Sequence, residues 1–154
     1  MKKANLYKIL AIDPATRTGW AISKELHGME NYSLKSGESS GFKLIKFKAF
    51  LERIIATEKI NLVVYERPGG RFKNDIMSHA KFIAIIETVC LEHKVEYRAY
   101  SPAEIKLHAT GKGNASKKDM ILAAIKLYKM KISDDNIADA LLLLSLAKKE
   151  LEIE

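Results

Sequence analysis

The chain has 154 residues, 47% of them apolar, and its 26 Lys and Arg outnumber its 19 Asp and Glu, which gives a net charge of +7. This apolar content supports a sizeable core and excludes intrinsic disorder, and the single cysteine, Cys90, excludes a disulfide framework or a multi-cysteine zinc module. No apolar run approaches the roughly 20 residues that cross a bilayer, and the basic N-terminus is a poor signal peptide. We therefore expect one domain over residues 1–154, in the cytoplasm and without a membrane partner.

The excess of positive charge favours a polyanionic partner such as nucleic acid, because each neutralised phosphate releases counterions. Charge alone leaves a basic protein with solvated lysines equally open.

The first half of the chain predicts strands followed by a helix. Three strands, over 6–12, 18–23 and 29–34, are separated by turn residues and predict an antiparallel meander. Apolar residues then recur at helical spacing over 42–58. The run over 62–65 is wholly apolar, which is typical of a strand covered on both faces.

The second half predicts one more strand and four helices. Helical spacing extends over 75–93, a strand over 95–100, and a short helix over 101–107 with Ser101 as its cap. Ser116 and Asp119 have the spacing of a capping box and open a helix through Tyr128. The last helix, over 136–149, is apolar nearly all round and should be buried. This order predicts an α/β domain in which helices pack on a five-stranded mixed sheet.

Three carboxylates fall where the pattern predicts burial. Asp13 ends the first strand, Glu66 ends the fourth, and Asp139 lies inside the apolar last helix, with Asp135 and Asn136 one turn before it. If the first and fourth strands are neighbours, Asp13 and Glu66 lie side by side at the sheet edge where α/β proteins place ligands. Oxygen ligands without a Cys or His framework suit Mg²⁺ or Mn²⁺, and two such ions can support phosphodiester hydrolysis.

Each acid also has a purely structural interpretation. An Asp before Pro is most often a turn residue, and a Glu after a strand is usually a solvated end. Asp135 is equally well explained as a helix N-cap. Taken together, in a basic chain, the acids favour a metal site over these separate explanations.

At these residues the sequence resembles the RuvC family of Holliday-junction resolvases, particularly its phage-encoded members. Five segments in the family's order, spread over nearly the whole chain, carry the resemblance: Ile9–Pro14 with Thr18–Ala21, Val63–Glu66, Pro102–Lys106, Thr110–Lys117 and Asp135–Leu141.

The resemblance implies an RNase H-like fold with helices on both faces of the sheet, and a homodimer. It also implies a Mg²⁺-dependent crossover junction endodeoxyribonuclease, with Mn²⁺ as a substitute and two ions per site, that resolves four-way junctions by paired nicks. The family's catalytic acids fall on Asp13, Glu66 and Asp139. The fourth acid falls on Asn136, which is a departure, so that Asn136 serves as an uncharged ligand or Asp135 takes its place. For the dimer interface, the helix over 75–93 is the first choice.

The resemblance also implies which residues contact DNA. The family's lysines match Lys106, near the catalytic edge, and Lys117, at a helix start, with Lys112 and Lys118 as weaker candidates by proximity. An aromatic residue often follows the acid of the fourth strand; here the only one available is Phe72, beside Arg71, and it is equally suited to starting the next helix's core face.

Three functions follow from these observations. The first is a structure-selective DNA endonuclease acting on branched DNA. The second is a junction-binding protein that has lost catalysis, which Asn136 keeps open, and the third is an RNase H-like nuclease acting on RNA. A nucleotide cofactor is not expected, because Gly111-Lys112-Gly113 lacks the other residues of a phosphate-binding Walker motif.

Overall fold

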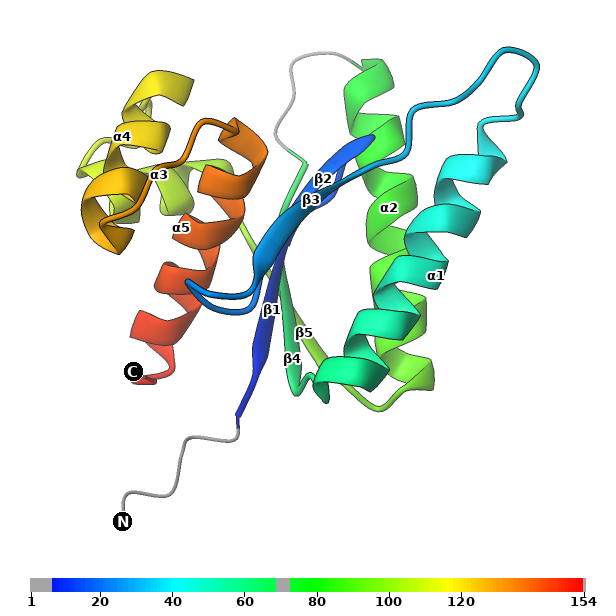
Figure 1. Ribbon diagram of the computed structural model, residues 1–154, viewed down its shortest axis with the longest axis horizontal. Helices are drawn as coiled ribbons and strands as arrows, with labels where there is room; N and C mark the ends of the chain where they lie inside the picture. The colour runs from blue at the N-terminus through cyan, green and yellow to red at the C-terminus, as the bar shows by residue number, and fades with distance from the viewer. Residues whose placement is uncertain (1–6, 69–72, 154) are drawn as a thin grey trace.

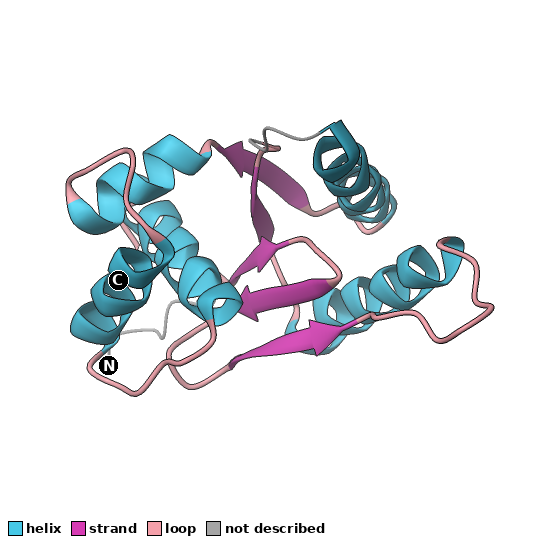
Figure 2. Ribbon diagram, turned by 90° about the horizontal axis from the view of Figure 1, so that it is seen from above, coloured by secondary structure: helices cyan, strands magenta, loops and turns pink. Residues whose placement is uncertain are grey.

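The fold is a five-stranded mixed sheet between two layers of helices (Figures 1 and 2). The computed structural model describes residues 7–68 and 73–153, and the side chains of residues 73–75 are not described. The strands and helices, in chain order, are β1 Ile9–Asp13, β2 Arg17–Ala21, β3 His27–Asn31, α1 Gly41–Glu58, β4 Leu62–Glu66, α2 Lys73–Glu92, β5 Glu96–Tyr100, α3 Pro102–Thr110, α4 Lys117–Tyr128 and α5 Asp135–Glu150. The α/β class and the mixed sheet predicted from the sequence are confirmed.

The sheet has the order β3-β2-β1-β4-β5. The pairs β1–β2 and β2–β3 are antiparallel, as a meander requires, whereas β1–β4 and β4–β5 are parallel. The parallel pairs put the carboxyl ends of β1, β4 and β5 at one edge, which is the upper edge in Figure 1. Each parallel connection contains a helix, α1 or α2, because a chain needs a long crossover to return in the same direction.

The two helical layers bury opposite sides of the same strands. Ile9 and Ala11 of β1 belong to the core packed by α3, α4 and α5. Leu10 and Ile12 belong to the core packed by α1 and α2. Alternate side chains of a strand point to opposite faces, so a strand covered on both sides is apolar at every position.

β4 and β5 differ from the prediction by one residue each, and the first three strands differ by more, for local reasons. β1 runs over 9–13 instead of 6–12, because Asp13 still pairs with Gly19 across the ladder. β2 ends at Ala21, where a turn begins in which the Ile22 and Ser23 amides donate to the Leu26 carbonyl. β3 begins at His27, which pairs with Ala21, and ends at Asn31, opposite Arg17.

The helix signals in the second half of the chain are confirmed. Ser101 and Ser116 both form complete capping boxes, with Glu104 and Asp119 respectively. The short helix α3 continues three residues beyond the predicted end, until Gly111 adopts a left-handed conformation with φ of 80°. The apolar helix α5 is buried as predicted, with Leu141–Leu144 at most 1% exposed.

Candidate metal-dependent nuclease site

Two acids of the site are fixed by neighbouring strands. β1 and β4 are parallel, and Ile12 pairs with Tyr65, so the next residues, Asp13 and Glu66, end their strands at the same level. Both acids are partly buried. The expectation that the first and fourth strands are neighbours, with these two carboxylates side by side at the sheet edge, is confirmed.

The start of α5 brings a third acid to this edge, and Gly19 makes that approach possible. Gly19 is buried in β2 and pairs with Asp13. A Cβ atom on Gly19 would lie 2.0 Å from the carbonyl oxygen of Asn136 in the first turn of α5. Only glycine allows this contact between backbones, and the contact seats the helix that carries Asp139.

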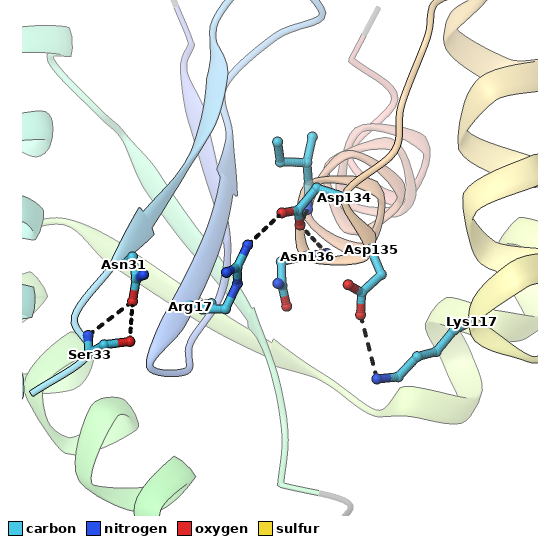
Figure 3. Close-up of polar contacts among 8 residues, drawn as sticks. Arg17, Asn31, Ser33, Lys117, Asp134, Asp135 and Asn136 are labelled. Atoms are coloured by element: carbon cyan, nitrogen blue, oxygen red, sulfur yellow. Dashed lines mark hydrogen bonds and ion pairs between the residues drawn. The ribbon is translucent and has the colours of Figure 1, made fainter.

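The N-cap of α5 is Asp134, so the interpretation of Asp135 as a helix cap is wrong. The Asp134 carboxylate accepts hydrogen bonds from the backbone amides of Asn136 and Ile137, at 2.8 and 3.3 Å. It also forms an ion pair of 3.3 Å with Arg17 of β2 (Figure 3). Asp135 is therefore not the cap but the first residue of α5.

Asp135 extends from this first turn toward Lys117. The Lys117 ammonium lies 3.7 Å from the Asp135 carboxylate, and Figure 3 shows Asn136 between Arg17 and Asp135. Lys117, Asp135 and Asn136 also line one side of a cavity of about 520 Å³, which Arg17 and His79 line as well. We call it the middle cavity.

A smaller cavity of about 210 Å³ adjoins it and contains two of the acids. We call it the acidic cavity; it is lined by Glu66, Pro102, Ile105, Lys106, Ala115, Lys117, Met120 and Asp139. It thus brings Lys106 and Lys117 together with Glu66 and Asp139, as the sequence predicts. Lys112 and Lys118 are exposed and do not line it, and Arg71 and Phe72 lie outside the described residues.

Burial, and for Asp13 and Asp139 the neighbouring acids as well, destabilises the charged forms of this cluster. Burial raises the pKa of Asp139 to about 7, and the charges of Glu66 and Asp135 add to this effect. Burial also raises the pKa of Asp13 well above its usual range, followed by the charges of Glu66 and Asp139. Burial raises the pKa of Glu66, while the nearby Lys106 lowers it. Burial therefore outweighs the positive charges of Lys106 and Lys117, which compensate these three carboxylates only in part.

The donor chemistry of the cluster fits a hard divalent cation. Among the hydrogen bonds and ion pairs of the described residues, none involves the carboxylates of Asp13, Glu66 or Asp139, although burial of an unpaired carboxylate is costly. The described side chains do not close into a ready-made group of three or more His, Cys, Asp or Glu around an ion. The oxygen donors and the mutual repulsion fit a cation such as Mg²⁺, which would draw the carboxylates together.

One residue at this edge was not assigned a role from the sequence. His79 of α2 is partly buried, and its Nε2 atom donates to the backbone carbonyl of Glu66 at 2.9 Å. Burial lowers the pKa of His79, so the neutral ring suffices for this bond. His79 ties the end of β4 to α2, a contact between segments 13 residues apart that no local pattern indicates.

The described part of the chain contains no helix long and apolar enough to cross a membrane.

Known proteins resemble this chain in both sequence and fold. No family model matches it. The "Crossover junction endodeoxyribonuclease RuvC" of Prochlorococcus marinus (strain MIT 9312) is 29% identical over 147 residues, covering 87% of this chain and 91% of the relative. The resemblance to the RuvC family is confirmed, and the enzyme class expected from the motifs is the one that this relative bears.

Solved structures agree on the fold. The RuvC structure of Thermus thermophilus superimposes with a TM-score of 0.76 at 18% identity, covering 94% of this chain and 96% of that one. RuvC of T. thermophilus in complex with a Holliday junction substrate gives 0.73 at 18% identity, over 91% and 92% of the two chains. The yeast mitochondrial Holliday junction resolvase Ydc2 gives 0.66 at 14% identity, over 92% and 77%. The RNase H-like architecture with helices on both faces is thereby confirmed.

Proposed function

From this kinship with RuvC in sequence and fold, we propose that the chain is a metal-dependent DNA endonuclease that resolves four-way junctions by paired nicks. The observation that carries the proposal is the meeting of strand-borne and helix-borne acids at one sheet edge. Burial raises the pKa of Asp13, Glu66 and Asp139 there, and the charge of Glu66 adds to the rise for both Asp13 and Asp139, beside Lys106 and Lys117. Acids without partners of their own, next to cations that face outward, suit a site that takes a metal ion and a phosphodiester together.

In this proposal Asp13, Glu66 and Asp139 hold the metal, together with Asn136 through its amide oxygen or Asp135 through its carboxylate. Mg²⁺ is the natural ion for this donor set, Mn²⁺ substitutes for it, and two ions occupy each site. When bound, the metal supplies an activated water and stabilises the leaving oxygen of the phosphodiester.

The two lysines of the acidic cavity bind the substrate and neutralise its charge. Lys106 is close enough to Glu66 and Asp139 to lower the pKa of both, so a phosphate beside these acids lies within its field. Lys117 is 87% exposed and paired with Asp135. A phosphate entering the cavity competes with Asp135 for Lys117, which couples substrate binding to the release of the Asp135 carboxylate. Lys112 and Lys118, on the exposed surface beside Lys117, extend the same contact to neighbouring phosphates.

A homodimer is part of the proposal, because a junction has two symmetric scissile positions and a two-fold enzyme presents one site to each. α2 supports it as the interface: Ile76 and Leu91 on this helix are 41% and 70% exposed. Large apolar side chains exposed along one helix favour burial against a partner. The site of action is the cytoplasm, that of the bacterial host if the chain is encoded by a phage.

A junction-binding protein without catalysis is the second candidate, because Asn136 replaces an acid of the family. The position of Asp135 argues against it. The charge of Asp135 reaches both Asp13 and Asp139, so the cluster retains four carboxylates despite the replacement.

The test is cleavage of three substrates of matched length: a four-way junction, a linear duplex and an RNA–DNA hybrid, each with Mg²⁺, Mn²⁺ or EDTA. The proposal predicts paired symmetric nicks on the junction, supported by both metals and abolished by EDTA. Tight junction binding without nicking in either metal would assign the chain to the second candidate. Cleavage of the hybrid alone would make it a nuclease acting on RNA.

A further inference from the structure

A third cavity continues the two that belong to the site. It measures about 420 Å³ and lies between the first turn of α1 and the second and third turns of α2, and we call it the α1–α2 cavity. Ser78 and Phe82 line both it and the middle cavity, and Lys117 lines both the middle cavity and the acidic cavity. The three cavities therefore adjoin in series and lead away from Glu66 and Asp139 toward the start of α1.

The α1–α2 cavity is positively charged. Its charged lining residues are Lys43 and Lys81, and none of its lining residues is acidic. Among the ion pairs of the described residues, none involves Lys43 or Lys81, whereas Arg17 and Lys117 in the middle cavity are each paired with an aspartate. The Lys43 ammonium also donates to the Thr16 hydroxyl, at 3.2 Å, in the turn that joins Asp13 to β2. The uncompensated charge thus lies directly beside the loop that follows a catalytic acid.

The remaining lining residues suit a sugar–phosphate backbone. The hydroxyls of Ser40 and Ser78 are hydrogen-bond donors for phosphate oxygens, and Leu44 and Met77 provide apolar surface for the sugar. Contacts of this composition position a nucleic acid without reading its sequence.

We propose that the α1–α2 cavity binds backbone phosphates of the same DNA strand whose scissile phosphate lies in the acidic cavity. This inference rests on the proposed function and deepens it, because it identifies Lys43 and Lys81 as DNA-binding residues outside the acidic cavity. The strand would pass the middle cavity, where Arg17 and Lys117 continue the row of cations.

The test compares a double variant with a control of equal charge. In Lys43→Gln/Lys81→Gln the two cavity ammonium groups are lost. In Lys24→Gln/Lys94→Gln two exposed lysines are lost from the turns at the opposite end of the sheet. Binding to a fluorescent four-way junction is measured by anisotropy at several salt concentrations, with Ca²⁺ as the divalent ion.

For the cavity variant we expect a dissociation constant raised about threefold to tenfold, and a slope of log K against log salt that is smaller by about two phosphate contacts. The control variant keeps the slope of the wild type.

Junctions with a single neutral methylphosphonate at successive positions beside the scissile phosphate locate the contact. At one or two positions the neutral linkage weakens binding by the wild type but not by the cavity variant. If every position affects both proteins equally, or if the cavity variant matches the control, the cavity is not a DNA subsite. If the wild type binds no branched DNA, the proposed function fails and this inference fails with it.

Discussion

The acids carried by strands and the acids carried by the helix reach the same site in different ways. Asp13 and Glu66 are placed by the ladder between β1 and β4, which is part of the core. Asp135, Asn136 and Asp139 depend on how the first turn of α5 is seated, and that seat consists of the Gly19 contact, the Asp134 cap and two ion pairs. We call Asp13 and Glu66 the strand half of the site, and Asp135, Asn136 and Asp139 the helix half. The strand half is held by the core of the fold, whereas the helix half relies on a few contacts, each of which a single substitution removes.

A substitution in the strand half should have the largest effect on the rate of junction cleavage. Asp13→Asn removes a charge from the centre of the cluster, and we expect junction cleavage to fall by about 1,000-fold while binding is kept or tightened. Single-turnover cleavage and anisotropy on the same junction measure both effects. Glu25→Gln, an exposed change in the turn after β2, is the control. Cleavage by Asp13→Asn at the wild-type rate would contradict the assignment.

The seat of the helix half is tested by Gly19→Ala. The new Cβ would lie 2.0 Å from the Asn136 carbonyl oxygen, so the first turn of α5 must move. We expect a loss of about 3 kcal/mol in the free energy of unfolding, together with loss of cleavage. Gly41→Ala, where the nearest atom is 3.8 Å away, is the matched control and should leave the free energy of unfolding nearly unchanged. Equal unfolding curves for Gly19→Ala and wild type would show that this contact does not seat the helix.

The repulsion between the two halves makes stability depend on pH. The pKa of Asp139 is about 7 in the fold, above its ordinary 3.8, so the native state holds this proton more tightly than the unfolded state. Without metal, stability should therefore fall as pH rises from about 4 to 7. Asp139→Asn removes part of this dependence and should stabilise the metal-free protein at pH 8 by about 2 kcal/mol.

Urea unfolding in EDTA at pH 5 and pH 8 measures this effect, with Glu25→Gln again as the control. If the free energy of unfolding falls equally for wild type and Asp139→Asn between the two pH values, the charge of Asp139 does not destabilise the metal-free protein.

Within the helix half, Asp135 and Asn136 are the two candidates for the fourth metal ligand, beside Asp13, Glu66 and Asp139. If Asp135 takes the place of the missing acid, Asp135→Asn should raise the Mg²⁺ concentration for half-maximal cleavage about tenfold, and Asn136→Ala should not. Asn136→Asp then provides a complementary test, because an added ligand lowers that concentration. The reverse ranking of Asp135→Asn and Asn136→Ala would assign the position to the Asn136 amide.

The difference between the strand-borne and the helix-borne acids also explains which parts of the site could be predicted from the sequence. Strand ends are marked by apolar runs, so Asp13 and Glu66 and their shared edge could be predicted from local pattern and the order of elements. The N-cap was harder to identify, because Asp134 and Asp135 are adjacent and a helix turns its residues by about 100° each. The bond from His79 to Glu66 and the Gly19–Asn136 contact join distant segments, and no periodicity in a single sequence reveals such contacts.

The central claim, that strand-borne and helix-borne acids share a metal ion, is tested most directly by Mn²⁺ binding followed by electron paramagnetic resonance. Wild type, Asp13→Asn, Asp139→Asn and Glu25→Gln are titrated at the same pH without DNA. The account predicts that both cluster variants raise the dissociation constant at least about tenfold and that Glu25→Gln does not. If Asp139→Asn binds Mn²⁺ as tightly as the wild type while Asp13→Asn does not, the two halves do not share an ion and the account is contradicted.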